Sequence, residues 1–210
     1  MTGGPDEMDA NFAGTFRPDQ STAVGRVMTR ICIGTDSRPD LVERLRWEIA
    51  QDIELRRAGL TDSVAPDVVD RLINAHNEQV LEPSATALGL ITALERLTDE
   101  GIVFGFGEGY GVHDSLDGVI RAAEELMRQG RSIDGYCFST VADVERMIFE
   151  QRLFVGFGVF NEHGEGSTAI GSRVAGAFRE QGLEVEWSGT SEHRIQVVGG
   201  YAIPYVDLPA

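Results

Sequence analysis

The chain has 210 residues, of which 42% are hydrophobic and 25% charged, as in ordinary globular proteins. Its 34 acidic residues outnumber its 18 basic ones, which gives a formal net charge of −16 at pH 7. This charge repels phosphate backbones and anionic lipid, and no apolar run approaches the roughly 20 residues of a membrane span, so neither nucleic acid nor a membrane is expected as a partner.

The N-terminal residues and the cysteines indicate a cytoplasmic protein without a bound cofactor. The first seven residues, Met-Thr-Gly-Gly-Pro-Asp-Glu, have neither the basic nor the apolar region of a secretory signal. Cys32 and Cys137 lie far apart, each in an apolar stretch. Two cysteines make neither a disulfide framework nor a four-ligand zinc site, so we expect buried free thiols and no metal.

The N-terminal part is predicted to be an arm followed by helices. Residues 1–25 mix glycine, proline and polar residues without a hydrophobic period, which is typical of a flexible arm. Val27–Ile33 is rich enough in β-branched residues for a short strand, and a helix is the rival interpretation. Apolar residues at helical spacing then predict three helices, each burying one face. These helices run from Asp36 to Gly59, from Ser63 or Pro66 to Pro83, and from Ser84 to Gly101.

After Gly101 strands alternate with helices in the order β-α-β-α-β-α-β-β, and the last two strands form a hairpin. This order favours a mixed sheet covered by helices. We therefore predict an α+β or α/β fold with about four to five strands, in three parts: an arm (1–25), a helical segment (26–83) and an α/β domain (84–206). The expected strands are Ile102–Phe106, Tyr136–Ser139, Leu153–Phe160, Leu183–Trp187 and Arg194–Val198.

Two stretches of the α/β domain look alike, Gly101–Gly130 and Leu153–Gly182. Each reads as an apolar strand, Gly-x-Gly, a loop with one histidine, and a helix that ends in Gln-Gly. A true duplication and a coincidence both stay open, since strand, glycine and helix often follow one another.

The first of these stretches contains a glycine-rich loop between a strand and a helix, where backbone N–H groups can bind a phosphate. A dinucleotide-binding fingerprint would need glycine at Tyr110, and no Gly-Lys-Ser/Thr is present. Glu108 also places a negative charge where an anion would bind. The alternative is close packing or sharp turning at the glycines Gly105, Gly107 and Gly109.

His113 and His163 take equivalent places in the two stretches, the first beside Asp114 and the second near Glu165. If the two strands are parallel neighbours, both loops open at one edge of the sheet, where ligands of α/β proteins bind. Two imidazoles with carboxylates could then hold a divalent metal or share acid–base chemistry. The alternative is that these are polar loop residues, with Asp114 as a helix cap.

No catalytic residue can be named from the sequence, which leaves open whether the protein is an enzyme. His76 lies on an apolar helix face, as expected of a core histidine, and no hydrolase, metalloprotease or kinase motif is present. The first hypothesis is a non-catalytic binding or interaction module with a protein partner. The second is a small-ligand binder or enzyme that uses the loops 105–114 and 161–167. A homodimer also stays open.

Five stretches of the second half carry a family resemblance: Gly135-Tyr-Cys-Phe138, Asp143-Val-Glu-Arg146, Leu153–Gly158, Leu183–Thr190 and Arg194-Ile-Gln-Val197. Through them, residues 90–198 resemble an uncharacterised family of domains of unknown function associated with actinobacteria. Many of its members carry Cys-Cys-x-x-Cys-Gly after the first strand, where this chain has its cysteine-free glycine loop. A metal or redox role implied by that motif is therefore not carried over, and the resemblance assigns no catalytic residue.

Overall fold

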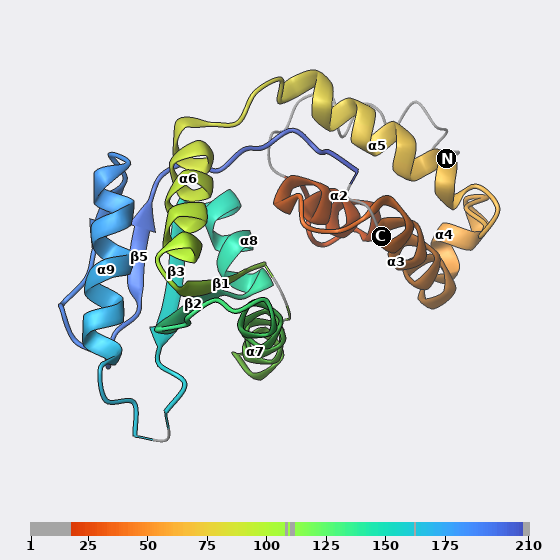
Figure 1. Cartoon of the computed structure of the whole chain (residues 1–210). Coiled ribbons are helices and arrows are strands. Elements are labelled where there is room, and N and C mark those ends of the chain that lie inside the picture. The colour runs from red at the N-terminus through yellow and green to blue at the C-terminus, as the bar shows by residue number, and fades with distance from the viewer. Residues whose placement is uncertain (1–17, 108, 110–111, 162, 208–210) are drawn as a thin grey trace. The chain divides into compact units, whose positions relative to one another are not determined.

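The structure is a computed structural model that describes residues 18–107, 109, 112–161 and 163–207, with Val112 and Asp114 described by backbone alone. Most of the predicted arm thus lies outside the described residues. Within them the chain forms eight helices and one five-stranded mixed sheet (Figure 1). The predicted α+β class with an N-terminal helical segment is confirmed.

The chain divides into two compact units. Among the described residues, the helical unit comprises 18–82 together with 202–207, and the α/β unit lies within 83–201. Residues 202–207 pack with the N-terminal helices, because the buried ring of Tyr205 belongs to the hydrophobic core of the helical unit.

The helical unit consists of α2 (Ala23–Ile33), α3 (Arg38–Gln51), α4 (Ile53–Arg57) and α5 (Ala65–Gln79). Its core combines apolar side chains that recur every third or fourth residue on α2, α3 and α5, among them Val27, Ile31, Leu41, Leu45, Val69 and Leu72.

The strand interpretation of Val27–Ile33 is wrong, and the rival helix is correct. The Thr22 side chain accepts a hydrogen bond from the Gly25 amide and so caps α2, while Gly34 ends the helix in the left-handed conformation. The helix predicted from Asp36 to Gly59 is interrupted at Asp52. The carboxylate of Asp52 caps the short α4 by accepting hydrogen bonds from its first turn.

The α/β unit follows the predicted order of strands and helices. Its helices are α6 (Ala85–Asp99), α7 (Val112–Arg128), α8 (Val141–Glu150) and α9 (Ser167–Glu180). Its strands are β1 (Ile102–Phe106), β2 (Gly135–Ser139), β3 (Arg152–Gly158), β4 (Glu184–Glu186) and β5 (Ile195–Val198). The strands lie in the order β1-β2-β3-β5-β4; only β1 and β2 are parallel, and the other neighbours are antiparallel.

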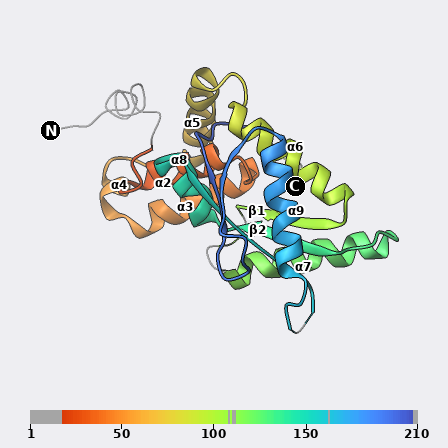
Figure 2. The same ribbon diagram turned by 90° about the vertical axis from the view of Figure 1, so that its left-hand side faces the viewer.

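Helices cover both faces of this sheet. On one face, Val119 and Ala123 of α7 pack with Val103 and Phe138 of β1 and β2. On the other face α9 approaches closely, since a Cβ on Gly135 would lie 2.7 Å from Ile170. The axes of α7 and α9 cross steeply, as two views at right angles show (Figure 1, Figure 2). None of the helices in the described part of the chain is long and apolar enough to cross a membrane.

Candidate functional site

The two histidine loops do not share an edge of the sheet. Strand β1 is parallel to β2, whereas β3 is antiparallel to β2, so β1 and β3 run in opposite directions on either side of β2. The loops after β1 and β3 therefore leave the sheet at opposite ends. His113, His163 and Glu165 are all exposed. Across the described residues, no three His, Cys, Asp or Glu side chains are grouped so that they could hold a metal ion.

The condition for a joint histidine site is therefore not met. The side chain of Asp114, predicted as a helix cap, lies outside the described residues.

The glycines of the loop after β1 have structural explanations. A Cβ on Gly105 would lie 2.9 Å from Val119 Cγ2, so its absence lets α7 pack closely on β1. Gly107 and Gly109 have φ angles of 66° and 64°, in the left-handed region that favours glycine. Ligand binding by this loop stays a prediction, and Glu108 and Tyr110 lie outside the described residues.

The same loop extends the pairing of β1 with β2 beyond the strand ends. The Gly107 N–H donates to the Ser139 carbonyl at 2.9 Å, and the Gly109 carbonyl accepts from the Val141 N–H at 2.9 Å. These main-chain groups are thus used within the fold, and the loop is joined to the first residue of α8.

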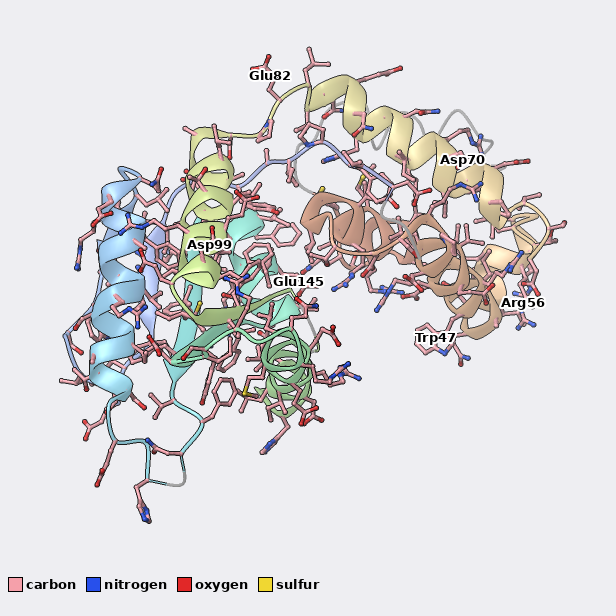
Figure 3. All side chains as sticks on the ribbon, viewed as in Figure 1. Trp47, Arg56, Asp70, Glu82, Asp99 and Glu145 are labelled. Atoms are coloured by element: carbon pink, nitrogen blue, oxygen red, sulfur yellow. The ribbon has the colours of Figure 1, made fainter. Side chains whose placement is uncertain are left out.

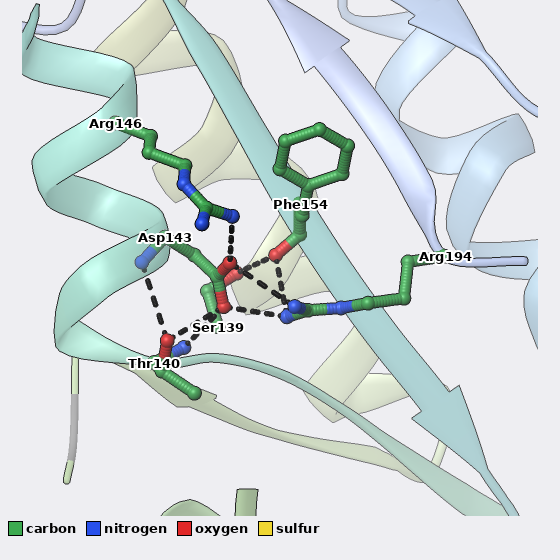
Figure 4. A network of polar contacts seen from close by, with 6 residues as sticks. All are labelled: Ser139, Thr140, Asp143, Arg146, Phe154 and Arg194. Atoms are coloured by element: carbon green, nitrogen blue, oxygen red, sulfur yellow. Dashed lines mark hydrogen bonds and ion pairs between the residues drawn. The ribbon is translucent and has the colours of Figure 1, made fainter. Parts of the chain in front are cut away.

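A connected polar network lies at this end of β2, centred on Asp143 (Figure 4). The Asp143 carboxylate, whose residue is only 2% exposed, accepts hydrogen bonds from the Thr140 N–H at 3.0 Å and the Thr140 hydroxyl at 2.7 Å. The Asp143 N–H donates in return to the Thr140 hydroxyl oxygen at 3.2 Å. These reciprocal bonds form a capping box, which fixes the first turn of α8.

Arg194, the residue before β5, joins this network from the opposite side. Its guanidinium donates to both carboxylate oxygens of Asp143, at 3.0 and 2.5 Å, and to the Phe154 carbonyl at 2.9 Å. It also lies 5.7 Å from the centre of the Phe138 ring, within the range of a cation–π contact. The side chain of Arg194 thus connects α8 with β2, β3 and the start of β5.

Two more side chains complete the network. The Ser139 hydroxyl donates to the same Phe154 carbonyl at 3.1 Å, and Arg146 Nη1 lies 3.9 Å from the Asp143 carboxylate. The carboxylate of Asp143 thus accepts three hydrogen bonds at Oδ2 and one at Oδ1. These bonds cap α8 and pair the carboxylate with Arg194, which gives Asp143 a structural role.

The sequence contains a signal for half of this network. Thr140-x-x-Asp143 is the spacing of a capping box, in which a threonine is followed three residues later by an acid. Arg194 could not be found in the same way, because its pairing with Asp143 depends on the register of β3 and β5.

The other side chains with reactive chemistry are also held within the fold. Burial raises the pKa of both thiols, Cys32 and Cys137, to about 12. His76 is buried, as expected, and burial lowers its pKa, which favours the neutral imidazole. Its Nε2 lies 2.8 Å from the Ile203 carbonyl, so Nε2 carries the proton and donates it, and Nδ1 lies 3.7 Å from the Cys32 sulfur.

The model of a domain family of unknown function, DUF6891, matches residues 17–199. The chain belongs to the DUF6891 family. The expected resemblance to a family of unknown function is thereby confirmed. Searches of curated proteins and of solved structures gave no match. The DUF6891 match includes Asp143 and Arg194 and assigns neither of them a function; residues 202–207 lie beyond it.

The α/β unit of this DUF6891 chain exposes apolar side chains beside α7. Ile120 and Met127 are 42% and 51% exposed, and they lie on one side of α7 because they are seven residues apart. Phe160, which follows β3, is 45% exposed, and its ring centre lies 5.0 Å from that of the half-buried Tyr136. Tyr136 in turn packs against the small core that α7 forms with the sheet. We call Ile120, Met127, Tyr136 and Phe160 the α7 surface.

Proposed function

We propose that this protein is a cytoplasmic, non-catalytic interaction module that binds a protein partner through the α7 surface. The observation that carries the proposal is the exposure of Ile120 and Met127 on one side of α7, together with that of Phe160, whose ring lies against the half-buried Tyr136. Exposed apolar area costs about 25 cal/mol per Å² relative to burial. Apolar side chains gathered beside one another therefore mark interaction sites more often than scattered ones do.

Acidic groups outnumber basic ones near the α7 surface. Asp117, Glu124 and Glu125 are exposed on α7 beside Arg121 and Arg128, and Glu165 is exposed in the loop that also contains Phe160. With the net charge of −16, these groups favour an apolar segment flanked by lysine or arginine. The same charge disfavours a second copy of the chain in this position, because two strongly acidic molecules repel each other.

The surroundings of the reactive side chains support binding over catalysis. The Asp143 carboxylate accepts from Thr140 and Arg194, and His76 donates to a main-chain carbonyl. Both thiols have pKa values raised to about 12 by burial, which leaves them protonated at neutral pH. Each of these groups is therefore part of the fold rather than directed at a substrate.

A peptide library displayed on phage, selected against the intact protein, tests this function. We expect enriched peptides to contain aromatic or aliphatic residues flanked by lysine or arginine. The double substitution Ile120→Glu/Met127→Glu should weaken their binding at least about tenfold, because burying either new carboxylate in an apolar interface is unfavourable.

The matched control is Trp47→Glu, which changes an apolar side chain that projects from α3 of the helical unit and is 59% exposed (Figure 3). This variant should bind the selected peptides like the wild type. The proposal is overturned if no peptide is enriched above background, or if enriched peptides bind the double variant as tightly as the wild type.

A further inference from the structure

Residues 202–207 form an extended segment that packs within the helical unit, and we call it the returning segment. It belongs to neither a helix nor a strand. Polar contacts join it to residues of α3 and α5 and to the connection between α2 and α3. These contacts have the form that a protein uses to recognise an extended peptide.

Two neighbouring side chains of α5 bind the main chain of the returning segment. The Asn77 carboxamide pairs with both main-chain groups of Tyr205: Nδ2 donates to its carbonyl at 3.0 Å, and Oδ1 accepts from its N–H at 2.8 Å. His76 Nε2 donates to the carbonyl of Ile203. Main-chain hydrogen bonds of this kind give affinity for extended peptides without depending on their side chains.

The side chains of the returning segment provide sequence specificity. Tyr205 is 6% exposed, its ring lies in the core of the helical unit, and its hydroxyl donates to the Asp36 carbonyl at 3.1 Å. Asp207 accepts a hydrogen bond from the N–H of Arg38, the first residue of α3, at 2.9 Å. A helix N-terminus favours a carboxylate through its free N–H groups and its dipole. The site therefore reads a tyrosine followed two residues later by an acid.

Adjacent glycines precede the returning segment. Gly199 has a φ angle of 152°, which other residues rarely adopt, and a Cβ on Gly200 would meet no atom within 4 Å. The Gly199 N–H donates to the Gln151 carbonyl at 2.9 Å, and the Gly200 carbonyl accepts from the Ser84 hydroxyl at 2.9 Å. Both glycines are thus anchored in the α/β unit, so β5, which ends at Val198, keeps its pairing when residues 202–207 leave their site.

We propose that the helical unit is a receptor for extended peptides of the pattern Tyr-x-Asp, and that the returning segment is its built-in, exchangeable occupant. A partner protein with such a segment competes with residues 202–207 for the contacts to Asn77, the tyrosine site and the N-terminus of α3. This interaction is separate from the α7 surface, which lies in the other unit.

The test uses the whole chain with a protease recognition sequence inserted between Gly199 and Gly200. After cleavage, the returning segment is held only by its non-covalent contacts. A fluorescent peptide of residues 200–210 is then added, and its exchange is followed by fluorescence anisotropy, while circular dichroism monitors the helices. We expect saturable binding, weakened at least about tenfold by Asn77→Ala, which leaves two main-chain groups of Tyr205 without partners.

Variants of the peptide and of the protein distinguish specific recognition from non-specific binding. Peptides with Tyr205→Ala should bind at least about a hundredfold more weakly, since a buried aromatic side chain is lost. Asp207→Asn, a milder change, should weaken binding a few-fold by removing the charge at the N-terminus of α3. Glu78→Gln, at the exposed α5 position next to Asn77, should have no effect.

Any one of three results would overturn the proposal. The first is that the cleaved segment does not exchange with the labelled peptide. The second is that a scrambled peptide binds as tightly as the native one, and the third is that the helices unfold when the segment is released. The last result would make residues 202–207 an inseparable part of the core.

Discussion

Arg194 donates two hydrogen bonds to the buried carboxylate of Asp143, which lies 51 residues earlier in the chain. This pairing ties the first turn of α8 to the start of β5. The side chain of Asp143 is 2% exposed and that of Arg194 is 35% exposed. The carboxylate is therefore removed from water, whereas the guanidinium is partly hydrated. Its two partners therefore respond differently to substitution.

Replacing Arg194 should destabilise the α/β unit more than replacing Asp143. Arg194→Met leaves a buried carboxylate with only the more distant Arg146, 3.9 Å away, as a cation, and removing one partner of a buried pair costs about 3–5 kcal/mol. Asp143→Asn leaves an arginine that solvent can reach, and we expect a cost of about 2 kcal/mol. Urea unfolding measures both costs.

The control for this comparison is the exposed pair of Arg173 and Asp134, at 2.8 Å. Asp134→Asn should cost less than about 1 kcal/mol. Equal costs for Asp134→Asn and Arg194→Met would contradict a structural role for the buried pair.

The capping box of α8 predicts a difference between two substitutions of Thr140. Thr140→Ala removes the hydroxyl that both donates to and accepts from Asp143, and it should cost about 1–2 kcal/mol. Thr140→Ser keeps the hydroxyl and should stay within about 0.5 kcal/mol of the wild type. Hydrogen exchange of the first amides of α8 provides the readout, with faster exchange expected in the alanine variant alone.

His76 makes the stability of the helical unit depend on pH. Burial lowers the pKa of His76 in the folded state below its ordinary value of about 6.5, so the unfolded chain takes up a proton first as the pH falls. The folded state therefore loses stability as the pH decreases from about 6.5 toward the lower folded pKa, and is unaffected by this group above that range. Urea midpoints at pH 7.5 and pH 5 measure the loss.

The variant His76→Gln isolates this effect, because an amide can still donate to the Ile203 carbonyl but does not titrate. Between pH 7.5 and pH 5, the free energy of unfolding should fall more for the wild type than for the variant. Parallel pH profiles for the two proteins would show that His76 does not contribute.

Both thiols should resist modification in the folded protein. With pKa values of about 12, on the order of one thiol in ten thousand is ionised at pH 8, and the thiolate is the reactive form. Mass spectrometry after iodoacetamide treatment should show unmodified Cys32 and Cys137 in the native state and both alkylated in urea. Rapid alkylation of Cys137 in the native protein would contradict its burial in β2.

Gly105→Ala should loosen the packing of α7 on β1. The added Cβ would lie 2.9 Å from Val119 Cγ2, which must move, and overpacking of this kind costs about 1–3 kcal/mol. Gly176→Ala, on α9, is the control, because a Cβ there meets nothing within 4 Å and alanine favours helix. A stable Gly105→Ala variant would indicate that α7 and β1 are not held this closely.

Local patterns in the sequence predicted the element order well, because each helix and strand buries its own periodic face. They failed at Val27–Ile33, where β-branched residues suggested a strand. The packing of α2 against α3 and α5 and the Thr22 cap outweigh that preference.

Relations between distant segments could not be read in this way. The direction of β3 relative to β1 depends on how each strand pairs with β2. The similar sequences of the loops after β1 and β3 therefore could not show at which end of the sheet each loop lies. The same limit applies to the pairing of Asp143 with Arg194, and to Tyr205, whose burial among the N-terminal helices leaves no periodic trace in the sequence.

The most direct test of the proposed interaction function is a methyl NMR titration of the intact protein, labelled at isoleucine and methionine, with a peptide selected on the α7 surface. We predict saturable shifts of the Ile120 and Met127 methyl signals, while the signals of Ile31 and Ile49, buried in the helical unit, stay in place. Saturable shifts that spare Ile120 and Met127 would contradict the account.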